Sequence, residues 1–228
     1  MTTDAFSDDF ITARKRSELA VILELAFAKG RNFEEVLELY ERALAIARDL
    51  GDRIAEGGVL GSIGSVYAQL EQPERAVAYY ERALAIAYEV GNRRLEAIAL
   101  GSLGEVYTDL GQLPRAIECH TQALAIAREI GDRRMESALL GDLGEAYRIM
   151  GRLVEAEEHL RAALEIARKS GYRYSEGYQL ARLGECLRDK GDVEQARRCL
   201  QEAITVLEEV KSPGVEEARA LLDELGPL

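Results

Sequence analysis

Cys119 stands directly beside His120, and a cysteine next to a histidine is a pair of residues that could carry out chemistry. A thiol next to an imidazole has the composition of a nucleophile with its general base. Neighbours along a helix, however, point about 100° apart and do not face each other. His120 also occupies a repeated position that elsewhere holds Tyr40 and Tyr80, which favours a packed side chain. We therefore expect no catalytic residue and no enzymatic activity.

A second combination, Cys119 with His159 and Cys199, could supply metal ligands, because the three positions are 40 residues apart. Equivalent positions in stacked repeats lie on the order of 10 Å apart, since packed helices are separated by about 8–10 Å. Zinc needs its ligands about 2.0–2.3 Å from one centre, so we expect no metal. The glycine-rich run at 57–64, GGVLGSIG, does not have the G-x-G-x-x-G spacing and does not follow a strand. We expect no nucleotide and no other cofactor.

The overall composition disfavours several classes of partner. The chain has 228 residues and a formal net charge of −12. Nucleic acids and anionic membranes bind basic surfaces, so we expect neither, and basic or amphipathic protein partners are favoured. No apolar run reaches the roughly 18–20 residues that cross a bilayer, and the acidic N-terminus does not have the pattern of a signal peptide. Three cysteines without framework spacing fit a reducing compartment, so a cytoplasmic protein is expected.

The elements that would position a site come from a repeat of 40 residues. Its period is visible in the columns Gly51, Gly91, Gly131, Gly171 and Leu60, Leu100, Leu140, Leu180. A fixed period of this size indicates a solenoid built from one supersecondary unit. Within 91–130, apolar residues recur at helical spacing, Gly111 interrupts them, and Pro114 follows where the first turn of a helix tolerates proline. Each unit is therefore predicted to be two antiparallel helices joined by a short turn.

Small residues occupy fixed positions in both predicted helices. The first helix holds Gly64, Gly104, Gly144 and Gly184, and the second holds Ala76, Ala116, Ala156 and Ala196. Glycine inside a helix costs about 0.5–1 kcal/mol relative to alanine, so four in register indicate close helix-to-helix approach. With the apolar, Leu-Gly, Tyr and turn-glycine positions around them, these columns resemble the tetratricopeptide repeat over residues 17–210. The 40-residue period is similar to the variant seen in kinesin light chains, cell-polarity adaptors and bacterial regulators.

The resemblance implies an all-α fold, a right-handed α-solenoid of antiparallel helix pairs that winds into a superhelix and ends in a C-terminal capping helix. We expect an acidic flexible tail at 1–12, a repeat array at 13–210 and the capping helix at 211–228. The array divides into one degenerate unit and four full units, at 13–50, 51–90, 91–130, 131–170 and 171–210.

The family geometry implies that the first helix of each pair lines a concave groove, through which a partner binds. The polar groove positions singled out as partner-binding residues are Glu105, Asp109, Asp142, Glu145, Arg148, Tyr178, Arg182, Glu185 and Arg188. Other groove positions are uncharged, among them Gly58, Gly61, Ser62, Ser65, Ile98, Gly101 and Ser102. An acidic concave wall concentrates cationic ligands, which predicts a peptide or helix with basic contacts and an apolar anchor. The alternative is that the Glu and Arg columns pair with each other as a solvated network.

Three tyrosines, Tyr172, Tyr174 and Tyr178, depart from the residue types that their columns hold in the other units. Tyrosine is enriched at binding hot spots, so this cluster is a further candidate for partner contact. The alternative is packing at an irregular turn between units.

An apolar patch of Val21, Ile22 and Leu25 is expected to face the groove from the degenerate unit. An exposed patch of this kind usually marks a partner. Residues 1–12 or a second copy of the chain could also cover it, which leaves a homodimer as an alternative.

Together these features predict a non-enzymatic scaffold that binds a protein or peptide through a concave, mildly acidic face. Relatives that clamp extended peptides usually place Asn at a groove column that here reads Ser62, Ser102, Asp142 and Arg182, so a helix or a folded partner is favoured. The alternatives are a sensor or regulatory module of a bacterial signalling or defence system acting in trans, and a self-assembling homodimer.

Overall fold

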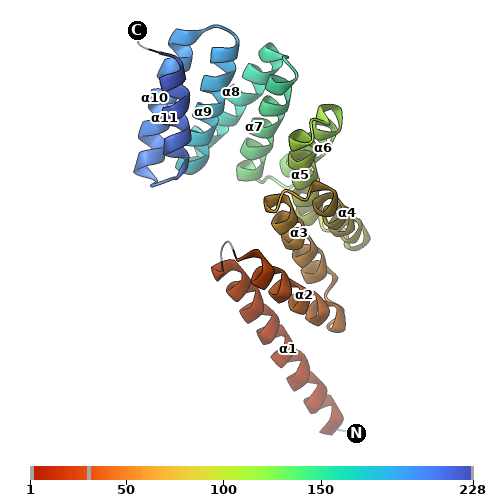
Figure 1. The fold of residues 1–228 in the computed structure, drawn as a ribbon. Coiled ribbons are helices and arrows are strands. Elements are labelled where there is room, and N and C mark those ends of the chain that lie inside the picture. Colours follow the sequence, from red (N-terminus) through yellow and green to blue (C-terminus); the bar gives the residue numbers. More distant parts are fainter. Residues whose placement is uncertain (1–2, 30–31, 227–228) are drawn as a thin grey trace. The chain divides into compact units, whose positions relative to one another are not determined.

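The chain folds into helices joined by short turns (Figure 1). The computed structural model describes residues 3–29 and 32–226, and within them it contains eleven helices and no strand. The helices are α1 (Thr3–Ala28), α2 (Phe33–Asp49), α3 (Arg53–Gln69), α4 (Pro73–Val90), α5 (Arg93–Asp109), α6 (Leu113–Glu129), α7 (Arg133–Ile149), α8 (Leu153–Ser170), α9 (Arg173–Asp189), α10 (Val193–Glu209) and α11 (Gly214–Glu224). The predicted all-α class is confirmed.

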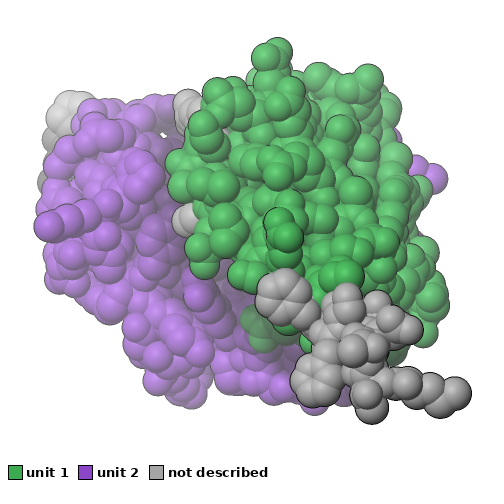
Figure 2. All heavy atoms as spheres, turned by 90° about the horizontal axis from the view of Figure 1, so that it is seen from below, with its two compact units in different colours: residues 1–106 green, residues 107–228 purple. Residues whose placement is uncertain are grey.

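Two compact units divide the chain, unit 1 at residues 1–106 and unit 2 at residues 107–228 (Figure 2). In unit 1, α1 packs on α2, α2 on α3, and α3 on α4. In unit 2, α6 packs on α7, α7 on α8, α8 on α9, and α9 on α10. Consecutive packed helices run antiparallel (Figure 1), so each unit is a stack of helix pairs. The predicted capping helix is α11, which lies on α10 and α9.

The first helix begins earlier than the sequence predicted. α1 starts at Thr3, so it covers most of residues 1–12, for which we expected a loose tail. No glycine or proline occurs before Gly30, and without these helix breakers nothing in the local sequence interrupts the backbone hydrogen bonds. Residues 1 and 2 of the expected tail lie outside the described residues.

Residues in the left-handed region of backbone conformation separate the helices. Gly91, with φ of 64°, ends α4, as the repeat predicts for a C-terminal cap. The turns within the later helix pairs use Gly111, Gly151 and Gly191, again with positive φ. Glu71, with φ of 55°, takes this place in the α3–α4 turn. The left-handed conformation costs a residue with a Cβ roughly 1–2 kcal/mol, so this turn is strained.

The glycine column inside the first helices permits close packing, as the sequence predicted. A Cβ added at Gly64 would lie 2.8 Å from Cε1 of Tyr80, and one added at Gly144 would lie 2.6 Å from Cγ of Leu160. Real Cβ atoms are not found so close to another side chain. The facing alanines are fully buried, at Ala76, Ala116, Ala156 and Ala196. In these pairs the first helix therefore approaches its second helix more closely than a larger residue would allow.

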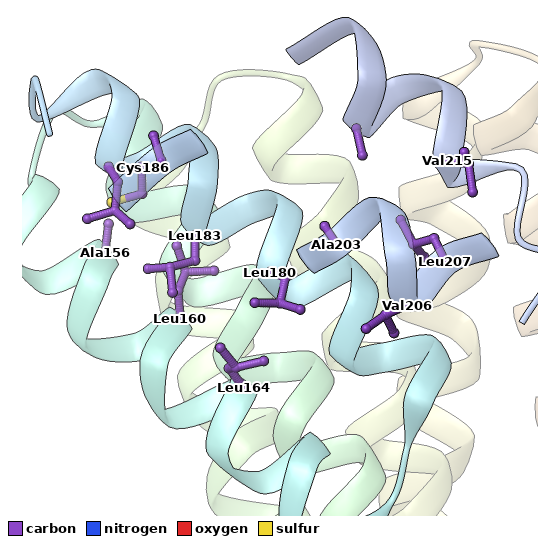
Figure 3. Packing of buried hydrophobic residues seen from close by; sticks show 13 residues of the cluster. Ala156, Leu160, Leu164, Leu180, Leu183, Cys186, Ala203, Val206, Leu207 and Val215 are labelled. Carbon is purple, nitrogen blue, oxygen red and sulfur yellow. The ribbon is translucent and has the colours of Figure 1, made fainter. Parts of the chain in front are cut away.

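Clusters of buried apolar residues lie between the helices of each unit. In unit 1, Leu60 and Ile63 from α3 pack with residues of α1, α2 and α4. In unit 2, Leu160, Leu180 and Leu183 come from α8 and α9 and pack together with residues of α10 and α11 (Figure 3). Burial of a leucine or isoleucine side chain contributes about 1.5–3 kcal/mol to the stability of the fold, so these leucines and isoleucines hold consecutive helix pairs together.

A column of buried glutamates joins consecutive pairs in addition to the apolar core. Its members are Glu56, Glu96, Glu136 and Glu176, each exposed by less than a tenth. Glu56 on α3 accepts hydrogen bonds from Arg48 of the preceding helix, at 2.8 Å, and from Arg53 of its own helix. Because a buried carboxylate is tolerated only when it is paired, the two arginines are structural parts of the fold. The periodic arginines are visible in the sequence, but their role as partners of a buried carboxylate was not predicted.

Candidate functional site

Groove positions of α3 and α5 enclose a hollow of about 280 Å³ in unit 1. Its lining comes from three helices and consists of Gly58, Gly61, Ser62, Ser65, Tyr80, Ala83, Leu95, Ile98, Ala99 and Ser102. Six of these ten residues are positions that the repeat geometry assigned to the groove, and none of the ten is charged. The hollow is thus an uncharged cavity at the face where a partner was expected.

Hydroxyl groups converge beneath the apolar walls of the hollow. The Tyr80 hydroxyl lies 3.0 Å from Oγ of Ser65, and Tyr80 is only 4% exposed. Burial raises the pKa of Tyr80, hydrogen bonds with Ser65 and Ser102 oppose the shift, and the nearby carboxylate of Glu105 adds to it. The phenol therefore stays neutral at physiological pH and offers hydrogen bonds without charge.

The glycines of the run at 57–64 have two different roles. A Cβ at Gly57 would lie 2.6 Å from Leu95, and one at Gly64 would meet Tyr80, so packing requires both glycines. A Cβ at Gly58 or Gly61 would meet no atom within 4 Å. These two positions open the hollow to its surroundings, and packing does not explain why they are glycine.

The charged groove positions of unit 2 pair with each other. Arg148 donates to Glu145 and to Asp189, both at 2.7 Å, and Arg182 donates to Asp142 at 2.8 Å. The structure therefore contains the ion network that the sequence offered as an alternative to partner contacts. Such pairs hold the side chains of these predicted groove positions in place and leave acidic and basic groups side by side.

Glu185 is the least well neutralised carboxylate of this network. It lies 3.7 Å from Arg148 and 3.9 Å from Arg188, too far for good hydrogen bonds. Burial raises the pKa of Glu185 despite the two arginines. Arg188 instead donates at 2.6 Å to Glu224 of the capping helix. On α5, Glu105 and Asp109 are exposed.

The tyrosine cluster lies against the start of the capping helix. The rings of Tyr174 and Tyr178 are 4.8 Å apart between centroids, and the Tyr178 hydroxyl is 3.2 Å from Oγ of Ser212. A Cβ at Gly214 would lie 2.8 Å from that hydroxyl oxygen. Tyr178 is therefore partly buried by packing, while Tyr174 remains exposed. Tyr172 is the N-cap residue of α9.

The expected apolar patch is corrected at one of its three positions. Ile22 is 2% exposed and belongs to the core of unit 1, whereas Val21 is 50% exposed and Leu25 is 47% exposed. The buried face of α1 follows Leu19, Ile22 and Ala26, which stand at i, i+3 and i+7 of one helical stripe. Val21 and Leu25 point away from it.

The cysteine and histidine combinations lie in surroundings that do not favour catalysis. His120 is 1% exposed, and burial lowers its pKa, so the imidazole is neutral. Burial also raises the pKa of Cys119, which keeps the thiol protonated and a poor nucleophile. Within the described residues, no group of three or more potential ligands could hold a metal ion. No helix in that part of the chain is both long and apolar enough to cross a bilayer.

Solved structures with the same fold come from several kinds of protein. BtubC (BKLC) from P. vanneervenii has a TM-score of 0.75 at 21% identity, over 91% of this chain and 85% of that one. A Rap protein complexed with competence and sporulation factor has a TM-score of 0.80 at 18% identity, over 91% of this chain and 62% of that one. A signal transduction ATPase with a tetratricopeptide repeat sensor, from Pyrococcus horikoshii, has a TM-score of 0.71 at 18% identity, over 92% of this chain and 34% of that one.

Sequence comparison leads to the same fold. No curated protein matches the chain. The profile of the tetratricopeptide repeat matches residues 18–89 and 95–169, and a second profile of that repeat matches residues 180–206. These matches cover well over half of the chain and coincide with the helix pairs. With its stacked antiparallel helix pairs and its column of packed glycines, the chain belongs to the tetratricopeptide repeat family.

Proposed function

We propose that this chain is a non-enzymatic binding module that holds a peptide or helical segment of another protein against its groove positions. The observation that carries the proposal is the hollow of about 280 Å³, because six groove positions line it. Ligand sites are concave and mostly apolar, with a few polar groups that orient the ligand, and this cavity has that composition.

Basic contacts are the second part of the proposal. Glu105 is exposed on α5, and Glu185 lies near two arginines that hydrogen-bond to other carboxylates. A partner's lysine or arginine would supply Glu185 with the charge-assisted hydrogen bond that it lacks. The net charge of −12 would also speed the approach of a basic segment.

A helical segment suits the groove better than an extended one. The column that would offer an amide to an extended backbone holds Ser62, Ser102, Asp142 and Arg182. Ser62 donates to the carbonyl of Gly58 at 3.1 Å, and Arg182 is paired with Asp142. Ser102 hydrogen-bonds to Tyr80, so all four side chains have partners within the chain, and an amphipathic helix needs fewer backbone contacts.

A regulatory role within this binding function has support from two of the solved structures. One Rap protein is complexed with competence and sporulation factor, and the Pyrococcus horikoshii protein carries its tetratricopeptide repeats as a sensor. In such a role, this chain would bind its partner in trans and pass the signal to another protein.

The test is affinity capture from the host with wild-type protein and with the charge-reversal variant Glu105→Lys/Glu145→Lys/Glu185→Lys. We expect the variant to lose the partner that wild type retains. The matched control, Glu81→Lys/Glu118→Lys/Glu158→Lys, introduces the same charge change at exposed positions of the second helices. Equal recovery with wild type and groove variant, or equal loss with both variants, would contradict binding through the groove.

A further inference from the structure

The starting observation is that Gly58 and Gly61 stand inside α3 without a packing reason. Alanine at either position would meet nothing within 4 Å, and alanine is the better residue inside a helix. The glycines at 57 and 64 of the same run are required by contacts with Leu95 and Tyr80. The open pair therefore preserves space that the chain itself does not use.

That space has apolar walls and an uncharged polar floor. Leu95, Ile98 and Ala99 form the α5 side, and Ala83 adds a surface from α4. At the floor, the hydroxyls of Tyr80 and Ser65 bind each other. Transfer of an ionised group from water into the hollow would cost free energy, because no residue of opposite charge lines it. The lining thus selects against phosphate, carboxylate and ammonium groups inside the hollow.

The size of the hollow distinguishes between two kinds of apolar occupant. Its volume of about 280 Å³ is just below the roughly 300–1,000 Å³ of sites that enclose drug-sized ligands. A single side chain from a protein segment requires less room and remains attached to a backbone outside. An acidic group also lies on the same helix face, because Ile98, Ser102 and Glu105 follow one another at i, i+4 and i+7.

We propose that the hollow over Gly58 and Gly61 receives one apolar side chain of the bound segment, and that a lysine or arginine about one helical turn away on the segment lies at Glu105. The position of Glu105 supports this arrangement, since its charge acts on the Tyr80 hydroxyl at the floor of the hollow. The inference rests on the proposed function and adds the location and chemistry of the anchor.

The experiment uses a displayed library of random twelve-residue peptides, selected on the full wild-type chain. Affinities of the recovered peptides are then measured for Gly61→Leu, which fills the hollow, and for Gly58→Ala, which narrows it. Gln69→Leu is the matched control, because it adds the same side chain to an exposed site on α3 outside the hollow. Thermal unfolding of each variant establishes that the fold is intact.

We expect recovered peptides to share an apolar residue with a basic residue three or four positions away. Binding should fall at least tenfold in Gly61→Leu, by a smaller factor in Gly58→Ala, and remain unchanged in Gln69→Leu. Replacement of the apolar peptide residue by aspartate should abolish binding to wild type. Unchanged affinity for a folded Gly61→Leu variant would overturn the anchor site.

Failure of the anchor site and failure of the proposed function give different results. If peptides bind Gly61→Leu normally but lose affinity for Glu105→Lys/Glu145→Lys/Glu185→Lys, the groove binds a segment and the anchor assignment is wrong. If neither set of substitutions affects the peptides, or if the library yields no binder, the result counts against both proposals.

Discussion

Gly64 of α3 and Tyr80 of α4 are so close that a Cβ added to the glycine would lie 2.8 Å from Cε1 of the tyrosine ring. The contact fixes the distance between the two helices of the pair, and it also sets the position of Tyr80 at the floor of the hollow.

Gly64→Ala should destabilise unit 1. Helix propensity alone would favour alanine, but the added methyl group overlaps Tyr80, and overpacking costs about 1–3 kcal/mol. The measurement is urea unfolding followed by circular dichroism, with Gly61→Ala as the matched control. Because a Cβ at Gly61 meets open space, the control should gain about 0.5–1 kcal/mol. Equal stability of the two variants would show that the contact is not tight.

Tyr88→Arg should stabilise the junction between α4 and α5. Tyr88 occupies the position of Arg48, whose Nε donates to Glu56 at 2.8 Å, while Glu96 accepts from Arg93 of its own helix at 2.6 Å. An arginine at 88 would give Glu96 a donor from the preceding helix, worth up to about 1 kcal/mol for a pair with one exposed member. Tyr88→Gln controls for the loss of the ring. A stability no higher than that of Tyr88→Gln in urea unfolding would contradict the assignment.

The stability of the chain should fall in acid partly because of Glu56. Burial alone would raise its pKa, but hydrogen bonds from Arg48 and Arg53 outweigh burial and lower the pKa below 4.5. A carboxylate with a lowered pKa in the folded state stabilises that state above its unfolded pKa, and the stabilisation disappears as pH falls through the folded value.

Glu56→Gln tests this linkage. We expect the variant to be less stable than wild type at pH 7, and the difference to shrink as pH decreases below 4.5. Chemical unfolding between pH 7 and pH 3 gives both curves, with Glu81→Gln as an exposed control on α4. A difference that stays constant with pH would mean that the ionised form of Glu56 does not stabilise the fold.

Glu71→Gly should relieve the strained turn between α3 and α4. Glu71 has a φ of 55°, where the later intra-pair turns have glycine. Glycine has no Cβ and so avoids the steric clash that a side chain causes in this region, and the variant should gain about 1 kcal/mol in the free energy of unfolding. Glu74→Gly, in the first turn of α4, should lose stability instead. A loss in both variants would show that Glu71 contributes contacts that outweigh its strain.

The sequence predicted the helix pairs and their close approach because both depend on local spacing. Gly64 and Gly144 stand at the same place in different units, and a glycine that recurs inside a helix indicates a neighbouring helix too close for a Cβ. Ile22 was misplaced because the degenerate unit was aligned by family offsets. Its own stripe of Leu19, Ile22 and Ala26 would have identified the buried face.

The polar interactions were harder to predict. The buried position of Glu56 was not predicted, because burial of its carboxylate depends on Arg48 from the preceding helix. The recurrence of glutamate three residues after each periodic arginine was the available signal. The hollow was predicted only as a small, uncharged part of the groove, since the meeting of Tyr80 with Ser65 depends on how α3 and α4 pack.

The glutamate column has a consequence for how such a chain can change in length. Arg128 on α6 binds Glu136 on α7, and Arg168 on α8 binds Glu176 on α9. The blocks 91–130 and 131–170 therefore each end with a donor and begin with an acceptor, Glu96 or Glu136. Tandem duplication of either block would create a new junction that already contains both halves of this ion pair, so the array can grow by gene duplication without a new kind of interface.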